Sequence, residues 1–155
     1  MCLNSLEDFT PARVGYQVKH KSGSTYSSLF FHADADAELG IEYTAKPEKV
    51  WAKSRPKHLG SVQILSGSRG ISKAIRDHCY IAGFHVFHKL EDARAYRKEY
   101  MYDDPAYAVV KVKCAGKKRT GIQNFMYWGS GTGDTRRISA HVTVCEQITI
   151  LKEVN

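Results

Sequence analysis

The spacing of apolar residues predicts strands in the first third of the chain. Residues 14–20 and 26–31 alternate between apolar and polar side chains, and residues 22–24 between them have the composition of a tight turn. The two segments therefore predict a β-hairpin. Residues 41–45 predict a further short strand, which ends before Pro47 because proline cannot donate to a sheet ladder.

A strand followed by a helix is predicted in the second half of the chain. Residues 83–88 alternate as a strand, and residues 90–100 place apolar side chains on one side at helical spacing. Residues 106–114 alternate again, and residues 116–121 predict a tight basic loop. The β-branched residues in 140–151 predict one long or bent strand. These elements predict an α+β fold, in which one main helix at about residues 90–100 packs on a mostly antiparallel sheet.

The stretch between these two regions has a weaker pattern. Residues 46–60 predict an exposed loop or a short helix, residues 61–65 a short strand, and residues 71–80 a short helix or irregular chain. No internal repeat is visible, and a length of 155 residues is close to the commonest domain size. We therefore expect a single domain over residues 1–155.

Membrane and secretory signals are missing from the sequence. No apolar run reaches the roughly 18–20 residues of a membrane span, and the first ten residues include two acids instead of a basic start and an apolar block. The four cysteines lack the spacing of a disulfide framework, and this pattern indicates reduced thiols. We therefore expect a cytoplasmic protein, of a host or of an infected cell, that does not act at a membrane.

The charge of the chain is positive and unevenly placed. The net charge is +7, and residues 46–76 and 109–137 hold most of the 23 lysines and arginines, whereas residues 32–42 contain four acids and no lysine or arginine. A basic surplus favours acidic partners such as a nucleotide, a nucleic acid or an acidic protein surface. The alternative is that the charge serves solubility alone.

A glycine-rich segment with flanking aromatic and basic residues is the main candidate ligand site. Alternating glycines allow backbone N–H groups to converge on an anion, arginines fork onto phosphate oxygens, and aromatic rings stack on bases. The spacing is neither that of a Walker loop nor that of a dinucleotide fingerprint, so a simple connecting loop between two strands is the alternative. The candidate residues are Tyr127, Trp128, Gly129, Gly131, Gly133, Arg136 and Arg137.

A second basic feature consists of Lys117, Lys118 and Arg119 in the predicted loop. Such a run is usually a solvated turn. If it lies beside Arg136 and Arg137, the two segments form one edge that attracts phosphate groups.

The histidines suggest chemistry only in part. The segment His141-Val142-Thr143-Val144 resembles half of the motif of two-histidine phosphoesterases, in which one histidine is the general base and the other the general acid. No other histidine repeats the motif, so His141 and His85 are candidates for an acid or base without an assigned partner. In a strand, His85 and His88 point to opposite faces, which argues against a metal site. We expect neither a metal nor a cofactor.

Several short segments resemble a scattered group of small phage and large-DNA-virus proteins of unknown function. The resemblance implies a viral or mobile-element origin and interference with a host defence, and it supplies no catalytic residues. The segments that carry it are Met1-Cys2-Leu3, Ser28-Leu29-Phe30-Phe31, Gly83-Phe84-His85-Val86-Phe87, Leu90-Glu91-Asp92-Ala93, Val109-Val110-Lys111-Val112 and Ile148-Thr149-Ile150-Leu151.

Three functions remain open at this point. The first is a non-enzymatic binding protein for a phosphate-bearing ligand, which is a nucleotide signal or a nucleic acid. The second is a nucleotide-directed phosphoesterase or transferase that uses His141 or His85. The third is a protein-interaction module that caps an acidic host protein with the basic residues around Trp51.

Overall fold

The computed structural model describes residues 3–28, 37–45, 49–51, 79–81, 83–128 and 135–154. For residues 28, 49–51, 79–81, 126–128 and 135–137 it describes the backbone alone. The strand predicted at residues 61–65 and the glycines of the segment 129–133 lie outside these ranges.

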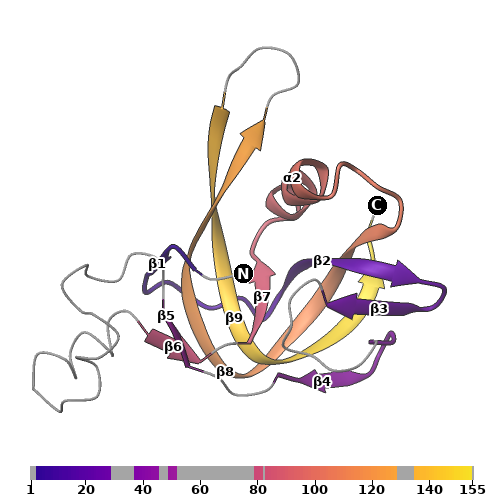
Figure 1. Ribbon diagram of the computed structural model, residues 1–155. Helices are drawn as coiled ribbons and strands as arrows, with labels where there is room; N and C mark the ends of the chain where they lie inside the picture. The colour runs from indigo at the N-terminus through magenta and orange to yellow at the C-terminus, as the bar shows by residue number, and fades with distance from the viewer. Residues whose placement is uncertain are drawn as a thin grey trace, which may run out of the picture.

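The described part of the chain is a mostly antiparallel seven-stranded sheet on which one helix packs, so the predicted α+β class is confirmed (Figure 1). The order of strands is β1-β8-β2-β7-β9-β4, with β3 paired to β2 and an additional pairing of β8 with β9. A separate two-stranded sheet pairs β5 with β6. The bounds are β1 Ser5–Leu6, β2 Val14–Ser22, β3 Thr25–Ser28, β4 Glu42–Thr44, β5 Lys49–Trp51, β6 Cys79–Ile81, β7 Phe84–Phe87, α2 Leu90–Tyr100, β8 Tyr107–Trp128 and β9 Thr135–Glu153.

The main sheet closes on itself through four strands. β8 pairs with both β2 and β9, and β7 pairs with both β9 and β2, so the pairing returns to its starting strand. β7 and β2 meet at a single pair, Tyr16 with Phe87. Gly15 permits this approach, because a Cβ atom at that position would lie 2.5 Å from the carbonyl oxygen of Phe87.

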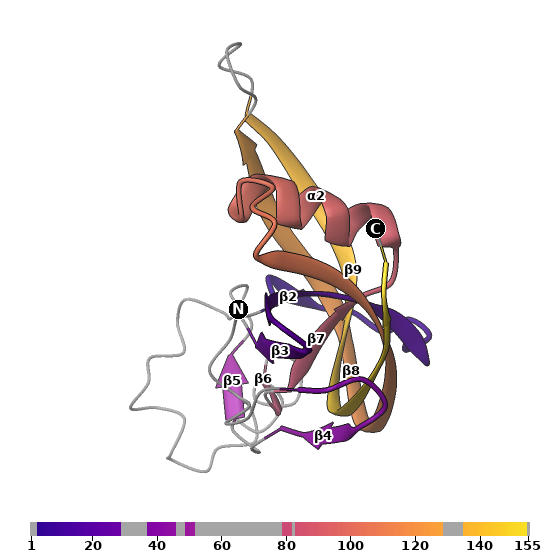
Figure 2. The same ribbon diagram turned by 90° about the vertical axis from the view of Figure 1, so that its right-hand side faces the viewer.

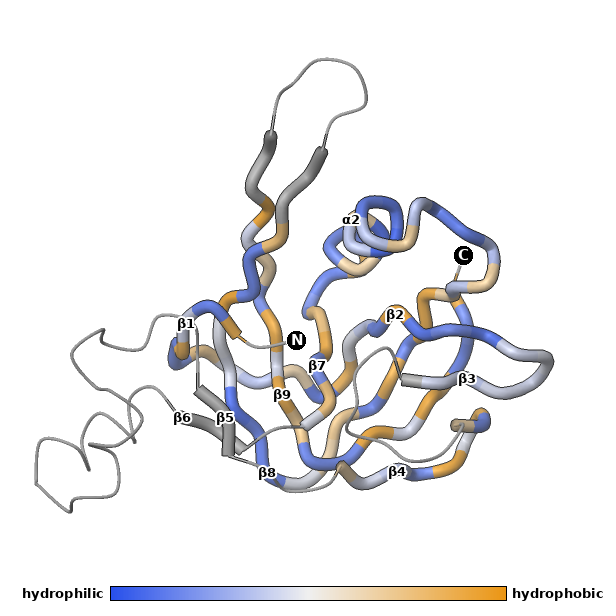
Figure 3. The backbone as a smooth tube through the Cα atoms, in the orientation of Figure 1, coloured by the Kyte–Doolittle hydropathy of each residue, from blue (hydrophilic) through white to orange (hydrophobic). Residues whose placement is uncertain are grey.

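Two hydrophobic cores lie on the two faces of this sheet. Neighbouring buried residues in the hydrophobic stretches of β8 and β9 (Figure 3), such as Val109 and Val110, belong to opposite cores, as the period of two in a strand requires. α2 covers one face, where Tyr96 packs against Phe87 and Phe125 at ring distances of 5.5 and 5.4 Å. Burial raises the pKa of Tyr96 to about 12. The other core contains Phe84, Ile148 and ten further buried side chains of its cluster.

The prediction of a loop at residues 116–121 is wrong. β8 continues through this region as one strand, and a β-bulge absorbs the irregular residues: Ala115 pairs with Gln147 and Lys118 with Cys145, so two residues oppose Glu146. Gly116 adopts a φ of +71° there, which only glycine adopts at little cost. The Glu146 carboxylate accepts the backbone N–H of Lys117 at 3.1 Å. The glycine and the basic run therefore mark a bulge instead of a turn.

Two predictions for the middle of the chain also need correction. Residues 49–51 form β5, although a loop or short helix was expected, and β6 begins at Cys79, within the segment expected to be helical or irregular. Val50 pairs with Tyr80, thirty positions further along the chain. Tertiary pairing of this kind overrides the local preference of a three-residue segment.

A lysine is buried in the core beside an unsatisfied amide oxygen. Lys19 is only 3% exposed, and its Nζ lies 5.8 Å from the centre of the Phe84 ring. Gln17, two residues earlier on β2, donates its Nε2 to the carbonyl of His85 at 2.8 Å, and its Oε1 has no hydrogen-bond partner among the described residues. Burial lowers the pKa of Lys19 to about 8 from 10.5. Folding therefore makes the charged amine less favourable than it is in the unfolded chain, although Lys19 is still mostly charged at pH 7.

Lys19→Met should raise the stability of the protein at pH 7. Below pH 8 the lysine is charged in both the folded and the unfolded state, and its buried charge destabilises the folded state. Between pH 8 and 10.5 the unfolded chain keeps the proton that the folded chain has lost, so wild-type stability rises with pH, by about 3 kcal/mol. Urea unfolding at several pH values measures this rise, which should vanish in Lys19→Met and persist in Lys113→Met, an exposed control on β8. If the free energy of unfolding changes with pH in the same way in the wild type and in Lys19→Met, the prediction is wrong.

Candidate functional site

The far ends of β8 and β9 form a two-stranded arm that projects beyond the rest of the sheet. Figures 1 and 2 show from two directions that the paired strand ends extend past α2. We call residues 126–128 and 135–137 the arm. Its base is braced by the helix, because Phe125 packs against Tyr96 at 5.4 Å and Tyr100 at 6.0 Å.

The register of the arm brings together the aromatic and basic residues that the sequence singled out. Tyr127 lies opposite Arg136, and Trp128 lies opposite Thr135. Arg137 lies opposite Met126, one step closer to the base. Residues from the two flanks of the glycine segment therefore occupy adjacent positions on paired strands.

The second basic feature does not lie beside the arm. Lys118 pairs with Cys145, whereas Arg136 pairs with Tyr127, nine positions further along β8. At about 3.3 Å per residue, the two groups are separated by roughly 30 Å along the ladder. The single phosphate-attracting edge considered from the sequence therefore does not form.

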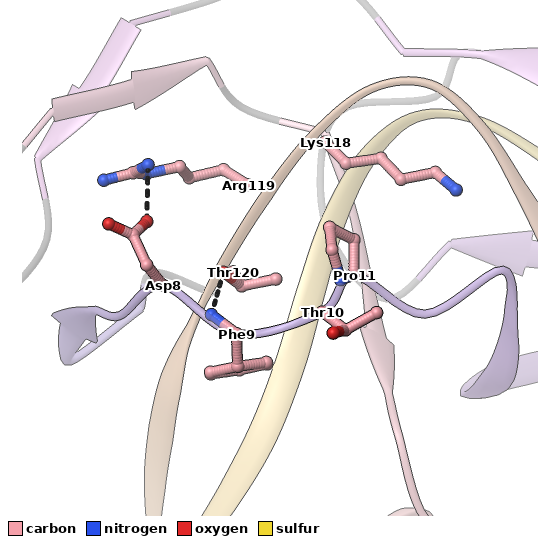
Figure 4. Close-up of a pocket in the computed structure, with 7 residues that line it drawn as sticks. All are labelled: Asp8, Phe9, Thr10, Pro11, Lys118, Arg119 and Thr120. Atoms are coloured by element: carbon pink, nitrogen blue, oxygen red, sulfur yellow. Dashed lines mark hydrogen bonds and ion pairs between the residues drawn. The ribbon is translucent and has the colours of Figure 1, made fainter.

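Lys118 and Arg119 instead line a hollow of about 510 Å³ next to the bulge of β8. The hollow lies between β8 and the residues 7–13 that connect β1 to β2. We call this connection the strap. Figure 4 shows that the two side chains point away from one another. Arg119 forms an ion pair with Asp8 at 3.0 Å, and the Nζ of Lys118 donates to the carbonyl of Ala12 at 3.3 Å. Both cations are thus occupied in holding the strap.

The strap is also held by two threonines of the sheet. Thr120 donates its hydroxyl to the carbonyl of Glu7 and accepts the N–H of Phe9. Thr143 on β9 is fully buried, and its Oγ1 accepts the N–H of Ala12 at 2.9 Å. These bonds attach the strap to both strands of the β8–β9 ladder.

A pair of histidines, half-buried His88 and exposed His141, lies against the strap next to Thr143. The Oγ1 of Thr143 lies 2.7 Å from the Nε2 of His88, and the rings of His88 and His141 are 6.3 Å apart. Phe9 of the strap packs on both rings, at 5.2 and 4.7 Å. We call the contacts among Phe9, Ala12, Thr143, His88 and His141 the clasp.

The clasp favours a neutral His88. Burial, and next the neighbouring His141, lower the pKa of His88. Since Thr143 already accepts a hydrogen bond from Ala12, its hydroxyl proton is available to the unprotonated Nε2 of His88. The His88 imidazole therefore suits the role of a general base, but the Phe9 ring packs against it.

His85 takes no part in this pair. Its Nδ1 lies 3.3 Å from the Oε1 of Gln123, which is opposite Ala140 on β9. Thr143 is three residues beyond Ala140 and so lies on the other face of the sheet. The prediction that His85 and His88 face opposite sides is confirmed. The neighbour of His141 is His88, which a search for a repeated motif could not find because the two residues meet through strand pairing.

The described residues contain no group of three or more His, Cys, Asp or Glu placed to hold a metal ion. Within the same ranges, no helix is long and apolar enough to span a membrane. Of the basic segment 46–76, the structure describes only the backbone of β5, so the protein-interaction hypothesis around Trp51 stays a prediction.

Comparisons with protein-family models, with curated proteins and with solved structures found no match to this chain. The resemblance to viral proteins therefore stays a prediction, and the function must be argued from the residues themselves.

Thr143→Val should loosen the strap and destabilise the fold. The substitution keeps the shape but leaves the N–H of Ala12 without its acceptor, at a cost of about 1–3 kcal/mol. Urea unfolding measures the loss, and hydrogen exchange should be faster at the Ala12 amide. Thr149→Val is the matched control, because Thr149 lies on the same strand and takes no part in the clasp. Equal effects of the two substitutions would contradict the role assigned to Thr143.

Proposed function

We propose that this protein is a non-enzymatic binding protein for a phosphate-bearing ligand, that the ligand is a single-stranded nucleic acid, and that the β8–β9 arm is its main contact. The observation that carries the proposal is the register of the arm. It pairs Tyr127 with Arg136 and places Trp128 and Arg137 at neighbouring positions. Aromatic rings that stack on bases and arginines that contact phosphates are the two elements of single-strand recognition.

The net charge of the chain supports a polymer over a single nucleotide. A nucleic acid strand presents a phosphate at every residue and can contact the arm while the net charge of +7 attracts its backbone.

The projecting shape supports the same ligand. A two-stranded ribbon that extends from a braced base exposes both of its edges to a partner (Figure 2). Because Phe125 is held by Tyr96 and Tyr100, the base of the arm is fixed before any ligand binds. A preorganised ribbon loses less conformational entropy on binding than a flexible loop.

The double variant Arg136→Ala/Arg137→Ala should bind a labelled single-stranded oligonucleotide about tenfold or more weakly. Loss of two phosphate contacts should also reduce the slope of log affinity against log salt by about one to two. Fluorescence anisotropy at several salt concentrations measures both quantities.

The control is Lys98→Ala/Lys152→Ala, which removes the same charge from exposed positions on α2 and on the opposite end of β9. If the two double variants bind equally well, binding depends only on the net charge of the protein and not on the arm, and the proposal fails.

A second candidate function is phosphodiester cleavage, favoured by the pair of imidazoles 6.3 Å apart beside the Thr143 hydroxyl. Neutral His88 would accept a proton from the attacking hydroxyl and His141 would donate one to the leaving oxygen. The position of Phe9 on both rings counts against this function. Turnover of a cyclic-phosphate nucleotide that disappears in both His88→Gln and His141→Gln would establish it. No turnover by Phe9→Ala, in which the pair is uncovered, would eliminate it.

A further inference from the structure

Two tyrosine rings of α2 form a nearly parallel stack at the base of the arm. The rings of Tyr96 and Tyr100 lie 4.8 Å apart, and their planes are inclined by only 14°. Tyr96 is 6% exposed and meets the ring of Phe125 edge-on. Tyr100 is 41% exposed, and its ring also meets the Phe125 ring at a steep angle, at 6.0 Å. The stack therefore has a buried inner ring and an outer ring that reaches the surface.

The register of the ribbon relates this stack to the arm. Phe125, which contacts Tyr100, pairs with Ile138, and both belong to the core under α2. Tyr127 comes two positions after Phe125 and pairs with Arg136. Positions two apart in a strand lie on the same face, so residues 127 and 136 occupy the α2-facing side of the ribbon. They follow Phe125 by about 7 Å along the strand.

We propose that Tyr100 is a further base-stacking contact, and that a single-stranded nucleic acid binds on the α2-facing side of the arm. This inference rests on the function proposed for the arm. One base stacks on Tyr100, and the adjoining nucleotides contact Tyr127 and Arg136. Arg137 is one position out of phase with Arg136, so it belongs to the opposite side of the ribbon and contributes less to binding.

The chemistry of the stack fits a base of any sequence. Tyr96 covers one face of the Tyr100 ring, and a planar base that adds at the other face extends the stack by one ring. Such stacking tolerates every sequence because each base has a π-face. Tyr96 and Phe125 already hold the Tyr100 ring in place, so little conformational entropy is lost when the base binds.

Tyr100→Leu should bind a fluorescein-labelled single-stranded oligonucleotide of mixed sequence about tenfold more weakly than the wild type. Leucine keeps an apolar side chain against Tyr96 but removes the ring on which a base stacks. The slope of log affinity against log salt should stay the same, because no charge is lost. Fluorescence anisotropy at several salt concentrations measures both quantities.

Two variants serve as controls for Tyr100→Leu. Tyr100→Phe keeps the ring and should bind as the wild type does. Tyr102→Leu removes a tyrosine that is 90% exposed and lies outside the core cluster under α2, so it should leave the affinity unchanged. An equal loss of affinity in Tyr102→Leu and Tyr100→Leu would overturn the inference.

The side of the arm is tested by single substitutions of its arginines. Arg136→Ala should account for most of the affinity lost in the double variant Arg136→Ala/Arg137→Ala, and Arg137→Ala for little of it. The opposite order would place the strand on the other side of the ribbon and would overturn the inference.

Photo-crosslinking of the wild-type chain gives a result even if Tyr100→Leu fails to fold. An oligonucleotide that carries 5-iodouracil should crosslink to peptides that contain Tyr100 and Tyr127. Crosslinks at the arm without any at Tyr100, or unchanged affinity of Tyr100→Leu where the double arginine variant binds weakly, would overturn this inference and leave the arm as the binding site. If the wild type binds no oligonucleotide, both proposals fail.

Discussion

The pairing of β8 with β9 is the interaction on which the rest of the structure depends. The two strands pair from Val110 with Glu153 to Trp128 with Thr135, interrupted by the bulge at Gly116 and Lys117. Each favourable cross-strand side-chain pair contributes roughly 0.2–1 kcal/mol, so a ladder of this length supplies much of the cooperativity of the sheet. One end closes the sheet through β2 and β7, and the other end continues as the arm.

The bulge lets one pair of strands serve these two purposes. A bulge bends its strand and increases its twist. Figure 1 shows that β8 curves at the bottom of the view and then rises towards the arm. The same irregularity places Lys118 opposite Cys145.

The strap is held by polar side chains of β8 and β9. Its atoms bind Thr120, Thr143, Lys118 and Arg119. Lys118 and Arg119 are therefore structural, and the arm is the ligand contact that we propose.

Much of the fold follows from local patterns. The helix at residues 90–100 is found with the predicted bounds, the first hairpin turns at Gly23, and residues 140–151 lie within one long strand. These features depend on short-range periodicity and turn chemistry, which a sequence displays directly. Glycine and lysine are common in loops and in bulges alike, so the sequence alone does not distinguish the bulge at Gly116 from a loop. β5 and β6 were missed because each needs a partner distant in sequence.

The candidate site was predictable only in its parts. The aromatic and arginine residues around the glycine segment could be singled out, but their pairing across the arm depends on register. The His88–His141 pair and the buried charge of Lys19 arise from contacts between strands, which no spacing along the chain reveals. The separation of Lys118 from Arg136 has the same origin.

The most direct test of this account is amide chemical-shift mapping with a single-stranded oligonucleotide of mixed sequence at low salt. If the arm is the binding surface, the largest changes should occur at residues 126–128 and 135–137 together, on both strands, and should diminish as salt is added. Changes confined to the hollow beside Arg119 or to α2, with the arm unaffected, would contradict the account.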